Sequence, residues 1–470
     1  MNISVIGAGY VGLTTAGCLA ELGHNVFCAE SDAQKLAKLQ AGVLPFFEPH
    51  LEEMVVRGRA ANRLNFGSTD DAIDHGRAIF ICVGTPPLDN GEADLSYIEA
   101  VARSIAKRAH GYRLVIEKST VPVQTGRQLR KQLAQHKNRH FDYDVASNPE
   151  FLREGSAVEN FFHPDRIVVG VESPRAEECL REIYAPMFEG KINCPAHVGC
   201  HGRKDIKLLV TDTNSAELIK HASNSFLAMK ISFINLIADL CEVAGADVTK
   251  VAEGIGLDPR IGASFLQPGI GFGGFCFPKD LQAFVRIGAK FNCDFSLLEE
   301  VEKINLSRVN LFVEKIKNEL WVLRGKKIAV WGLSFKPNTD DIRFAPSLTL
   351  IKRLASEGAI IEAYDPQAMD KAKEELPNIS YGEDPYDTAK DADLILLVTE
   401  WDEFRNLDWR RLASLVARPL VIDGRNFLPG KEIAANGFSY VGIGGVSEQP
   451  DPANLIADVE QPISPEVAAD

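Results

Sequence analysis

The amino-acid sequence predicts an α/β fold in which two doubly wound parallel sheets are joined by a long central helix and a helical middle segment. Three observations predict it. Short β-rich runs alternate with helical patterns near the N-terminus, the alternation restarts after residue 326, and an apolar-periodic stretch without Pro or Gly lies between them. Alternation of this kind is typical of parallel sheets with helices on both faces.

The N-terminal elements follow one another at short intervals. Apolar runs predict strands at Ile3–Gly7, Asn25–Glu30, Ala78–Val83, Leu114–Lys118 and Tyr143–Ser147. Helical patterns occupy Val11–Leu22 and Asp32–Ala41. The strand runs are apolar almost throughout, which is expected of strands that are buried on both faces of a sheet.

The middle of the chain is predicted to be helical. From Asn214 to Val243 the periodicity continues for about thirty residues, and at 1.5 Å per residue such a helix is about 45 Å long. A helix of this length is able to join two domains and to carry a dimer interface. Shorter helical patterns follow as far as about Asn318.

The last part of the chain restarts the α/β pattern. Strands are predicted at Lys327–Trp331, Ile360–Tyr364, Asp393–Thr399 and Pro419–Asp423, with a helix at Ser347–Gly358. The sequence thus predicts domains at residues 1–212, 213–318 and 319–446, followed by a flexible acidic tail at 447–470. Because ligands of doubly wound sheets bind beyond the carboxyl ends of the strands, we expect a cleft between the two halves to hold them.

The composition narrows the class of protein. The formal net charge of −14 on 470 residues argues against a general nucleic-acid-binding protein, because such a protein presents a basic face. No apolar stretch approaches the length of a membrane span, and the first residues lack the basic leader of a signal peptide, so we expect neither membrane insertion nor secretion. Nine Cys residues, mostly in apolar contexts, favour reduced thiols in a cytoplasmic protein.

One cluster contains residue types that bind metals. Cys194, His197, Cys200 and His201 lie within eight positions. The paired spacing of a zinc ribbon or zinc finger is missing, however. The sequence therefore predicts no metal site.

A glycine-rich motif joins the first predicted strand to the first helix. It reads G-x-G-x-x-G and consists of Gly7, Ala8, Gly9, Tyr10, Val11 and Gly12. Gly7 allows a tight turn, Gly9 allows backbone to approach a pyrophosphate, and Gly12 allows the helix to pack closely on the strand. Glu30 ends the second strand, where a carboxylate accepts from ribose hydroxyls and repels a 2′-phosphate; Asp32 is less suited to that role. The motif predicts a Rossmann-like domain that binds NAD, with the phosphates at a helix N-terminus.

A second glycine-rich segment carries the predicted chemistry. Four of the six residues 269–274 are glycine, Cys276 follows, and Pro278 suits the first turn of a helix. A thiol just before a helix N-terminus and near Lys279 is expected to have a pKa lowered from about 8.5, which makes it reactive. The alternative is a small buried apolar cysteine, which an open glycine loop disfavours.

The segment GFGGFCFPKD resembles the active-site motif of the UDP-glucose/GDP-mannose dehydrogenase family, in its UDP-glucose branch. Further family motifs match in order: GAGYVG, CVGTP at Cys82–Pro86, EKSTVPVQTG at Glu117–Gly126, SNPEFLREG at Ser147–Gly155, AELIKHASNSFLAMKISFIN at Ala216–Asn235, DPRIG at Asp258–Gly262, GLSFKPNTDDIR at Gly332–Arg343 and DGRN at Asp423–Asn426. The match spans nearly the whole chain outside the tail.

The resemblance implies oxidation of UDP-glucose to UDP-glucuronate by two successive hydride transfers to two NAD, without release of the aldehyde. An aldehyde does not lose hydride usefully until a nucleophile makes its carbon tetrahedral. Thiolate addition gives a thiohemiacetal, its oxidation gives a thioester, and water cleaves the thioester to the acid. The resemblance also implies a homodimer, NAD binding by residues 1–212, a dimer interface and the catalytic Cys loop in 213–318, and UDP-sugar binding by 319–446.

Matched positions imply the catalytic roles. Cys276 is implied as the nucleophile, with Lys220 and Asn224 as stabilisers of oxyanion character at the reacting carbon. Asp280 is implied to work with Thr120, through a water molecule, in proton transfer. Glu150 is implied to activate water for thioester hydrolysis, so the implied catalytic residues are Cys276, Lys220, Asn224, Asp280, Thr120 and Glu150.

Matched positions also imply the binding residues. The implied cofactor contacts are Gly7, Gly9, Tyr10, Val11, Gly12, Glu30, Lys35, Gly84, Thr85, Pro86, Ser119, Thr120, Glu154, Lys279 and Arg343. The implied substrate contacts are Glu150, Phe151, Leu152, Arg153, Glu154, Lys220, Asn224, Arg260, Phe265, Gly271, Gly273, Phe335, Lys336 and Arg425. Arginine suits bidentate recognition of phosphate, and the resemblance implies that Arg260 reaches across a subunit boundary.

The chain departs from the family pattern at three positions. Glu30 stands where the family often has Asp, Phe275 where a small residue is usual, and His221 where an aromatic residue is more usual. Two alternative functions stay open: a sister enzyme that oxidises GDP-mannose or a UDP-N-acetylhexosamine, and a non-catalytic NAD-binding scaffold. A scaffold would have no reason to retain all six catalytic residue types.

Overall fold

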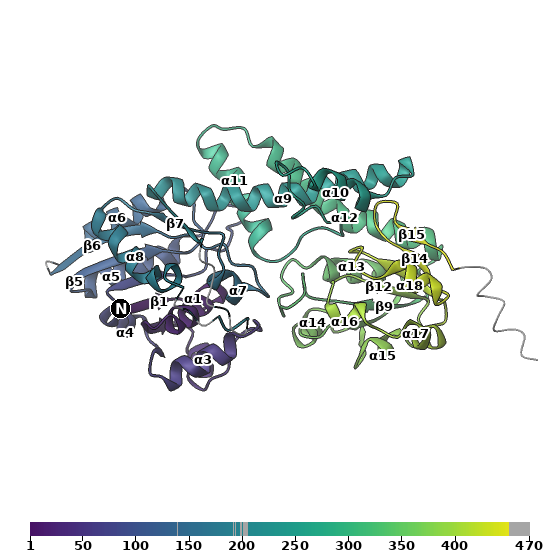
Figure 1. Cartoon of the computed structure of the whole chain (residues 1–470), viewed down its shortest axis with the longest axis horizontal. Helices are drawn as coiled ribbons and strands as arrows, with labels where there is room; N and C mark the ends of the chain where they lie inside the picture. Colours follow the sequence, from purple (N-terminus) through teal and green to yellow (C-terminus); the bar gives the residue numbers. More distant parts are fainter. Residues whose placement is uncertain (139, 191, 193, 198–199, 201–204, 451–470) are drawn as a thin grey trace, which may run out of the picture. The chain divides into compact units, whose positions relative to one another are not determined.

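The computed structural model describes residues 1–450 except 139, 191, 193, 198–199 and 201–204. The chain forms two compact units (Figure 1). Unit 1 contains Met1–Phe226 and Cys276–Glu299, and unit 2 contains Leu227–Phe275 and Glu300–Asp470. The predicted helical middle, residues 213–318, is divided between the two units, and the boundaries of three domains stay a prediction.

Unit 1 is built on an eight-stranded sheet with the order β3-β2-β1-β4-β5-β6-β7-β8. Its strands are β1 (Asn2–Ile6), β2 (Asn25–Ala29), β3 (Leu64–Gly67), β4 (Ala78–Ile81), β5 (Gly111–Glu117), β6 (Phe141–Ser147), β7 (Arg166–Gly170) and β8 (Lys207–Thr211). Neighbours from β3 to β6 pair in parallel, β6 and β7 pair antiparallel, and β7 and β8 pair in parallel. The last two strands therefore run opposite to the others.

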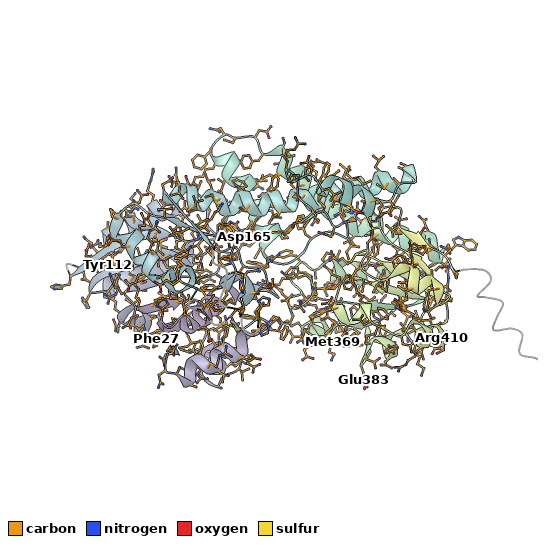
Figure 2. All side chains as sticks on the ribbon, in the orientation of Figure 1. Phe27, Tyr112, Asp165, Met369, Glu383 and Arg410 are labelled. Atoms are coloured by element: carbon orange, nitrogen blue, oxygen red, sulfur yellow. The ribbon has the colours of Figure 1, made fainter. Side chains whose placement is uncertain are left out.

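Helices cover both faces of this sheet. The helices of the unit are α1 (Tyr10–Glu21), α2 (Ala33–Gln40), α3 (Leu51–Ala60), α4 (Thr69–His75), α5 (Ser96–Arg108), α6 (Thr125–His136), α7 (Ala157–Phe162), α8 (Pro174–Phe188) and, apart from those on the sheet, α11 (Cys276–Lys290). Alternate strand residues point to opposite faces, so Val5 and Phe80 belong to one apolar cluster while Ile6 and Ile79 belong to another. Side chains fill these layers, and the ring of Phe27 packs against His75 of α4 (Figure 2).

Unit 2 repeats the architecture with a seven-stranded sheet in the order β11-β10-β9-β12-β13-β14-β15. Its strands are β9 (Lys327–Trp331), β10 (Ile360–Tyr364), β11 (Ser380–Tyr381), β12 (Leu394–Leu397), β13 (Leu420–Asp423), β14 (Ser439–Val441) and β15 (Ser447–Glu448). All pairs are parallel except β14 with β15. Val330 and Ala329 belong to separate clusters on the two faces. The predicted fold of two doubly wound sheets with helices between them is confirmed.

The helices of unit 2 are α10 (Val248–Gly256), α13 (Pro346–Ser356), α14 (Met369–Glu375), α15 (Pro385–Ala389), α16 (Asp402–Arg405), α17 (Trp409–Leu415) and α18 (Gly430–Ala435). Two further helices, α9 (Thr213–Ala244) and α12 (Ser296–Leu320), contribute residues to both units. α9 has 32 residues and agrees with the predicted long helix within one residue at each end. No helix among the described residues combines the length and the apolarity that crossing a membrane requires.

The start of the predicted tail needs a correction. Ser447 and Glu448 form β15 and pair with Val441 and Tyr440 of β14, so this part of residues 447–470 extends the sheet. The partly buried Val446 packs against the apolar clusters of unit 2 and so holds the turn between the two strands. Residues 451–470 lie outside the described residues.

Candidate active site

The turn between β1 and α1 is shaped to admit a pyrophosphate. Gly7 has a φ of +102°, and a Cβ on it would lie 2.7 Å from the carbonyl O of Cys82. A Cβ on Gly12 would lie 1.8 Å from the carbonyl O of Gly7, so both positions exclude a side chain. A Cβ on Gly9 would have no atom within 4 Å. The backbone at Gly9 therefore borders open space at the N-terminus of α1, as close approach of a dinucleotide requires.

Glu30, directly after β2, presents a carboxylate next to this turn. It accepts hydrogen bonds from the backbone N–H groups of Ser31 (2.8 Å) and Asp32 (3.0 Å), and it pairs with Lys35 Nζ at 2.8 Å. Burial alone would raise the pKa of Glu30, but these hydrogen bonds and Lys35 lower it below its ordinary value. Asp32 instead caps α2 by accepting from the N–H groups of Gln34 and Lys35, each at 2.9 Å. Asp32 is therefore occupied by the cap of α2, and Glu30 is the acid of this turn that suits a ribose. The turn fits NAD.

A buried glutamate that the sequence prediction missed connects α1 with α7. The hydroxyl of Tyr10 donates to Glu48, which is 4% exposed. The same carboxylate accepts from the N–H groups of Gly155 and Ala157, each at 2.6 Å. Burial raises the pKa of Glu48, although these hydrogen bonds oppose the rise. Glu48 thus fixes the segment that contains Glu154 to α1, the helix that follows the dinucleotide turn.

The loops after β4 and β5 meet at the carboxyl edge of the parallel strands. Ser119 Oγ donates to the carbonyl O of Val83 (2.7 Å), and Thr85 Oγ1 donates to the carbonyl O of Thr120 (2.9 Å). A Cβ on Gly84 would have no atom within 4 Å, so this loop also borders open space. Four predicted cofactor contacts are thus held together at the sheet edge where ligands of doubly wound folds bind.

The predicted catalytic side chains gather in unit 1 from three stretches of chain. Glu150 follows β6, Lys220 and Asn224 stand one turn apart on α9, and Cys276 and Asp280 stand one turn apart at the start of α11. Lys220 Nζ donates to Glu150 Oε1 at 2.8 Å, and both side chains are only 5% exposed. The spacing of four residues puts each helical pair on one face, as the sequence predicts.

Asp280 is the centre of a second buried group. Its Oδ2 accepts from Asn224 Nδ2 at 2.6 Å, and its Oδ1 accepts from Lys279 Nζ at 2.6 Å. Burial would raise the pKa of Asp280, but Lys279, Lys220 and His221 lower it below its ordinary value. Burial would likewise lower the pKa of Lys220, yet Glu150 and Asp280 raise it. A carboxylate and an ammonium group therefore face the same small region at neutral pH.

The surroundings of Cys276 correct the sequence prediction for its thiol. Loss of hydration, then the Asp280 and Glu150 carboxylates, raise its pKa to about 12, and Lys220 opposes them only in part. The side chain itself is exposed, so the carboxylates are the cause that persists when water has access. The predicted lowering of the pKa is wrong, because the helix N-terminus and Lys279 were weighed without these acids. The resting thiol holds its proton.

The loop after β5 anchors α9 through residues to which the sequence analysis gave no role in the site. His221 Nε2 donates to the carbonyl O of Val121 at 2.8 Å, and Glu217 accepts from the N–H groups of Gln124 (2.6 Å) and Gly126 (2.7 Å). Burial raises the pKa of Glu117 well above its usual range, and Glu217 raises it further, so Glu117 keeps its proton. The loop that carries Thr120 is thereby fixed to the helix that carries Lys220. A water-mediated link from Thr120 to Asp280 stays a prediction.

The predicted substrate loop, residues 150–154, is ordered by its own contacts. Glu150 Oε2 accepts from the N–H of Leu152 at 2.5 Å, and Arg153 donates from its backbone N and its Nε to Asn160 Oδ1, each at 3.1 Å. The ring of Phe151 has the Arg166 guanidinium 3.7 Å from its centroid. Glu154 is near enough to Cys276 to raise the pKa of the thiol. The loop therefore presents Glu150 toward the catalytic residues while its other side chains hold it in place.

Unit 2 gathers part of the predicted sugar-nucleotide site around residues 269–275. A Cβ on Gly271 would lie 2.8 Å from Asn305 Oδ1, and a Cβ on Gly273 would lie 2.4 Å from the carbonyl O of Phe344. Arg425 Nη1 donates to the carbonyl O of Gly271 at 3.3 Å. The loop is therefore so closely packed that neither glycine can be replaced without displacing backbone.

The aromatic and basic contacts of unit 2 account for one departure from the family pattern. The guanidinium of Arg343 stands 4.7 Å from the centroid of the Phe275 ring. The ammonium group of Lys336 stands 5.4 Å from the centroid of Phe335. Phe275 thus has a cation–π partner that a small residue would lack.

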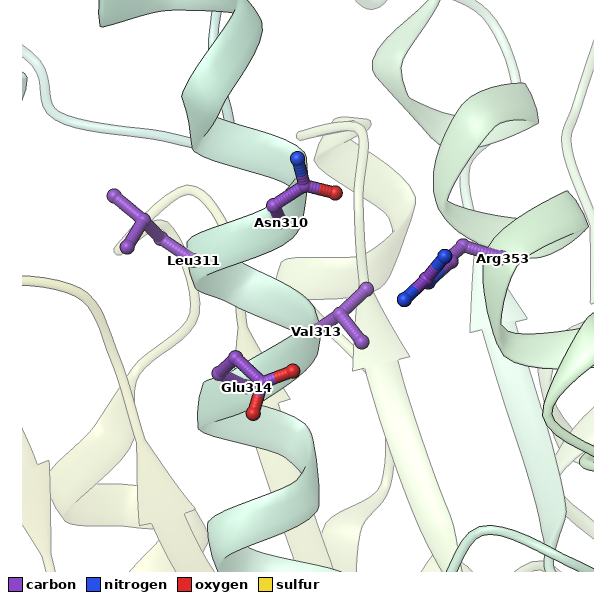
Figure 3. A pocket seen from close by; sticks show the side chains of 5 residues that line it. All are labelled: Asn310, Leu311, Val313, Glu314 and Arg353. Carbon is purple, nitrogen blue, oxygen red and sulfur yellow. The ribbon is translucent and has the colours of Figure 1, made fainter.

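Arg260 and Phe265 are two further predicted substrate residues of unit 2. Arg260 has an 87% exposed side chain that pairs with Asp258 at 2.6 Å, and Phe265 has a φ of +65°. Arg260 is not brought to the other predicted contacts within unit 2, and its role across a subunit boundary stays a prediction. A pocket elsewhere in unit 2 lies between α12 and α13 (Figure 3) and is lined by Asn310, Leu311, Val313, Glu314 and Arg353. It contains none of the predicted site residues.

Comparison with known proteins gives a consistent result along the chain. Three models of the UDP-glucose/GDP-mannose dehydrogenase family match it: the NAD-binding domain at residues 1–188, the central domain at 214–307 and the UDP-binding domain at 329–430. A UDP-glucose 6-dehydrogenase of Rhizobium meliloti is 44% identical over 94% of this chain and 99% of its own length.

Two solved structures show the same arrangement of elements. A UDP-glucose dehydrogenase of Pyrobaculum islandicum aligns with a TM-score of 0.84 and 36% identity, over 95% of this chain and 98% of its own. A UDP-D-ManNAc dehydrogenase of Pyrococcus horikoshii aligns with a TM-score of 0.79 and 25% identity, over 95% of this chain and 99% of its own.

Proposed function

The chain belongs to the UDP-glucose/GDP-mannose dehydrogenase family, and we propose that its own reaction is the NAD-dependent oxidation of UDP-glucose to UDP-glucuronate. The higher identity to UDP-glucose dehydrogenases than to the acetamido-sugar relative supports this substrate. The observation that carries the proposal is the convergence of a thiol, an ammonium group, an amide and two carboxylates at Cys276, Lys220, Asn224, Glu150 and Asp280.

The first oxidation converts the primary alcohol at C6 to an aldehyde. NAD supplies the hydride acceptor when it is bound. The hydroxyl proton leaves to a base, for which Asp280, ionised and buried, is the candidate together with Thr120. Lys220 and Asn224 stabilise the negative charge that develops on the C6 oxygen, because charged and amide donors in a site of low dielectric act strongly on such an oxyanion.

The second oxidation needs Cys276. Its sulfur adds to the aldehyde carbon, and the thiol proton passes by way of a neighbouring carboxylate to the carbonyl oxygen, which becomes the hydroxyl of a thiohemiacetal. Loss of that hydroxyl proton and of a hydride from carbon gives a thioester. A raised thiol pKa suits this order, because a resting thiolate would be exposed to stray oxidants before the aldehyde is formed.

Hydrolysis completes the sequence. Water adds to the thioester carbonyl carbon, one water proton leaves to a base, and the Cys276 sulfur departs and regains a proton. Glu150 is the proposed base, since its Oε1 is held 2.8 Å from Lys220 and its Oε2 by the N–H of Leu152. These contacts fix the orientation of the carboxylate, and Lys220 remains beside the oxygen that becomes negative.

The basic and glycine-rich part of unit 2 is the proposed binding site for the UDP moiety. Arg425 and Lys336 supply positive charge for the pyrophosphate, and Gly271 and Gly273 allow the close packing that fixes the loop beside Arg425. Arg260 is exposed on the described chain, as a residue that completes a partner's site would be.

A homodimer is part of the proposal. Exposed apolar residues recur on α9 at Phe233, Leu236, Leu240 and Val243, spaced by three or four residues. This stripe covers one helix face, and Val243 is 84% exposed. Unsatisfied apolar faces of this kind mark association surfaces, and self-association through a twofold axis is the commonest form. A cytoplasmic location is also proposed, since the cysteines of the described chain are free thiols.

The proposal is tested with purified protein and a panel of sugar nucleotides. UDP-glucose is expected to yield two NADH per sugar consumed, and GDP-mannose and UDP-N-acetylhexosamines are expected to yield little. Two NADH per GDP-mannose with none from UDP-glucose would establish the sister activity instead. NAD binding without NADH formation from any sugar would indicate a scaffold. Size-exclusion chromatography with light scattering measures the dimer, and Leu240→Glu is expected to shift it toward monomer.

A further inference from the structure

Four side chains that the catalytic chemistry does not use converge at one edge of unit 1. His163 follows directly after α7, while Cys194, His197 and Cys200 lie between α8 and β8. Their ligand-type atoms all lie within 4.8 Å of one another. His163 Nε2 is 3.1 Å from Cys194 Sγ and 3.6 Å from Cys200 Sγ, and His197 Nδ1 is 3.6 Å from Cys194 Sγ.

These separations match a tetrahedral metal site. With metal–sulfur bonds of about 2.3 Å and metal–nitrogen bonds of about 2.0–2.1 Å, neighbouring ligand atoms of a tetrahedron lie roughly 3.3–3.8 Å apart. Two of the measured distances fall in that range, and the third requires a small outward movement. Two thiolates with two imidazoles are the ligand set that selects zinc. We propose that His163, Cys194, His197 and Cys200 bind one zinc ion.

Backbone hydrogen bonds close the turn that carries three of the ligands. The sequence from 194 to 200 reads C-x₂-H-x₂-C, and the turn closes on itself because Cys200 N donates to the carbonyl O of His197 and Cys194 N donates to that of Cys200, each at 3.2 Å. The backbone N–H groups of Ala196 and His197 are directed at the sulfur of Cys194. Backbone donors to a ligating sulfur are typical outer contacts of a metal site.

His197 also has the outer partner that a metal-bound imidazole requires. Its Nδ1 faces the cysteines, and its Nε2 lies 3.6 Å from Glu159 Oε1 on α7. A carboxylate on the far nitrogen holds the ring in the tautomer whose other nitrogen coordinates the metal. Glu159 and His163 come from the same short segment, so α7 and the residue after it supply one ligand and one orienting group.

The spacing rule applied to the sequence missed this site because His163 precedes Cys194 by 31 positions. The residue that stood in its place in the sequence prediction, His201, lies outside the described residues. The proposal therefore replaces the prediction of no metal. Four protein ligands leave no open position for a substrate, so the role of the ion is structural.

The position of the ion suggests what it stabilises. α7 is held at its start by Glu48, through the N–H groups of Ala157 and Gly155, and the ion would hold the residue after its end. The loop just before α7 contains Glu150. We expect the ion to tie this stretch to the turn that carries Cys194, His197 and Cys200, and so to keep the Glu150 loop in place without touching substrate.

The test measures metal in the full-length protein. Protein purified without chelator and desalted is analysed by inductively coupled plasma mass spectrometry, with about one zinc per chain expected. Cys194→Ser and His163→Ala are each expected to remove at least nine-tenths of that zinc. Cys293→Ser is the matched control, because Cys293 is an exposed thiol in unit 1 outside the cluster, and it is expected to retain the full content.

A second measurement keeps the proposal testable when a variant does not fold. Wild-type protein stripped with chelator and refilled with Co²⁺ is expected to show the intense visible bands of tetrahedral cobalt with thiolate ligands. The proposal would be overturned if the purified protein contained no zinc and took up none when zinc was added. It would also be overturned if both ligand variants contained as much zinc as the Cys293→Ser control. Loss of two hydrogens in the intact mass, reversed by reductant, would identify a Cys194–Cys200 disulfide and overturn it too. None of the four ligands is among the proposed NAD and sugar contacts, so failure of the zinc proposal leaves the expected two-NADH stoichiometry unaffected.

Discussion

Replacing Lys220 by methionine is expected to destabilise the protein as well as to stop the reaction. Lys220 and Glu150 form a 2.8 Å ion pair in which each side chain is 5% exposed. Methionine fills most of the same volume, so the change leaves a buried carboxylate without its cation rather than a cavity. Removal of one member of a buried pair typically costs about 3–5 kcal/mol of unfolding free energy.

The reverse change is expected to cost less. Glu150→Gln leaves Lys220 with a second carboxylate, Asp280, whose charge also raises the pKa of the lysine. Combining Lys220→Met with Glu150→Gln removes both charges, so the double variant is expected to be more stable than Lys220→Met alone. All three variants are expected to lose turnover, with kcat reduced by about 10²–10³ for loss of an oxyanion donor.

Urea unfolding of the ligand-free protein at pH 7.5, followed by far-UV circular dichroism, measures the stability differences. NADH formation at saturating UDP-glucose measures the turnover. Recovery of stability in the double variant without recovery of kcat separates the electrostatic role of the pair from its chemical role. An unfolding midpoint for Lys220→Met equal to that of wild type, or a double variant no more stable than Lys220→Met, would refute the assignment of a buried, mutually dependent pair.

Four further outcomes are expected. Cys276→Ser should bind UDP-glucose with unchanged affinity in calorimetry but make no acid, and normal steady-state acid production would exclude the thioester route. In peptide mapping at pH 7, iodoacetamide should alkylate Cys276 at least tenfold more slowly than the exposed Cys293, because few thiols with a pKa raised to about 12 are ionised; equal rates would contradict the raised pKa. Glu30→Ala should raise the KM for NAD about tenfold and reduce discrimination against NADP, so an unaltered NAD/NADP preference would assign the ribose contact elsewhere. Because the pKa of Glu117 is raised in the folded protein, its contribution to stability is complete below its ordinary pKa and is lost as pH rises toward the folded-state value. The melting temperature of Glu117→Gln should therefore rise relative to that of wild type from pH 5 to pH 9. A difference in melting temperature that is constant with pH would argue against a protonated Glu117.

The parts of the fold and site that the sequence predicted share one property, which is that their signals are local. The glycine turn, Glu30, the strand runs and the spacing of four between Lys220 and Asn224 or between Cys276 and Asp280 are all readable within a few residues. Resemblance to a family extended this reading along the chain, and it assigned to one site Glu150 and Lys220, which pair in the structure.

What could not be predicted depends on groups that are distant in sequence. The pKa of Cys276 is raised by loss of hydration, by Asp280 and also by the carboxylate of Glu150, which stands more than a hundred residues earlier. Glu48 reaches both Tyr10 and the N–H groups at the start of α7, and no motif marks it. His163 joins the cysteines of the 194–200 turn only through the packing of α7. A rule based on the spacing of residues in the sequence does not detect contacts between residues that are distant in the sequence.

The chain passes between the two units three times, after Phe226, after Phe275 and after Glu299. Cys276, the proposed nucleophile, therefore belongs to a segment that returns from unit 2 to unit 1. A cut after the first α/β repeat, at residue 212, would leave a fragment with a nucleotide cradle but without Lys220, Asn224, Cys276 or Asp280. Gene fusions, nicked variants and recombined relatives are subject to the same constraint. The dinucleotide-binding part can be exchanged as one block, whereas the oxidation chemistry requires that the helical stretch carrying these residues be exchanged with it.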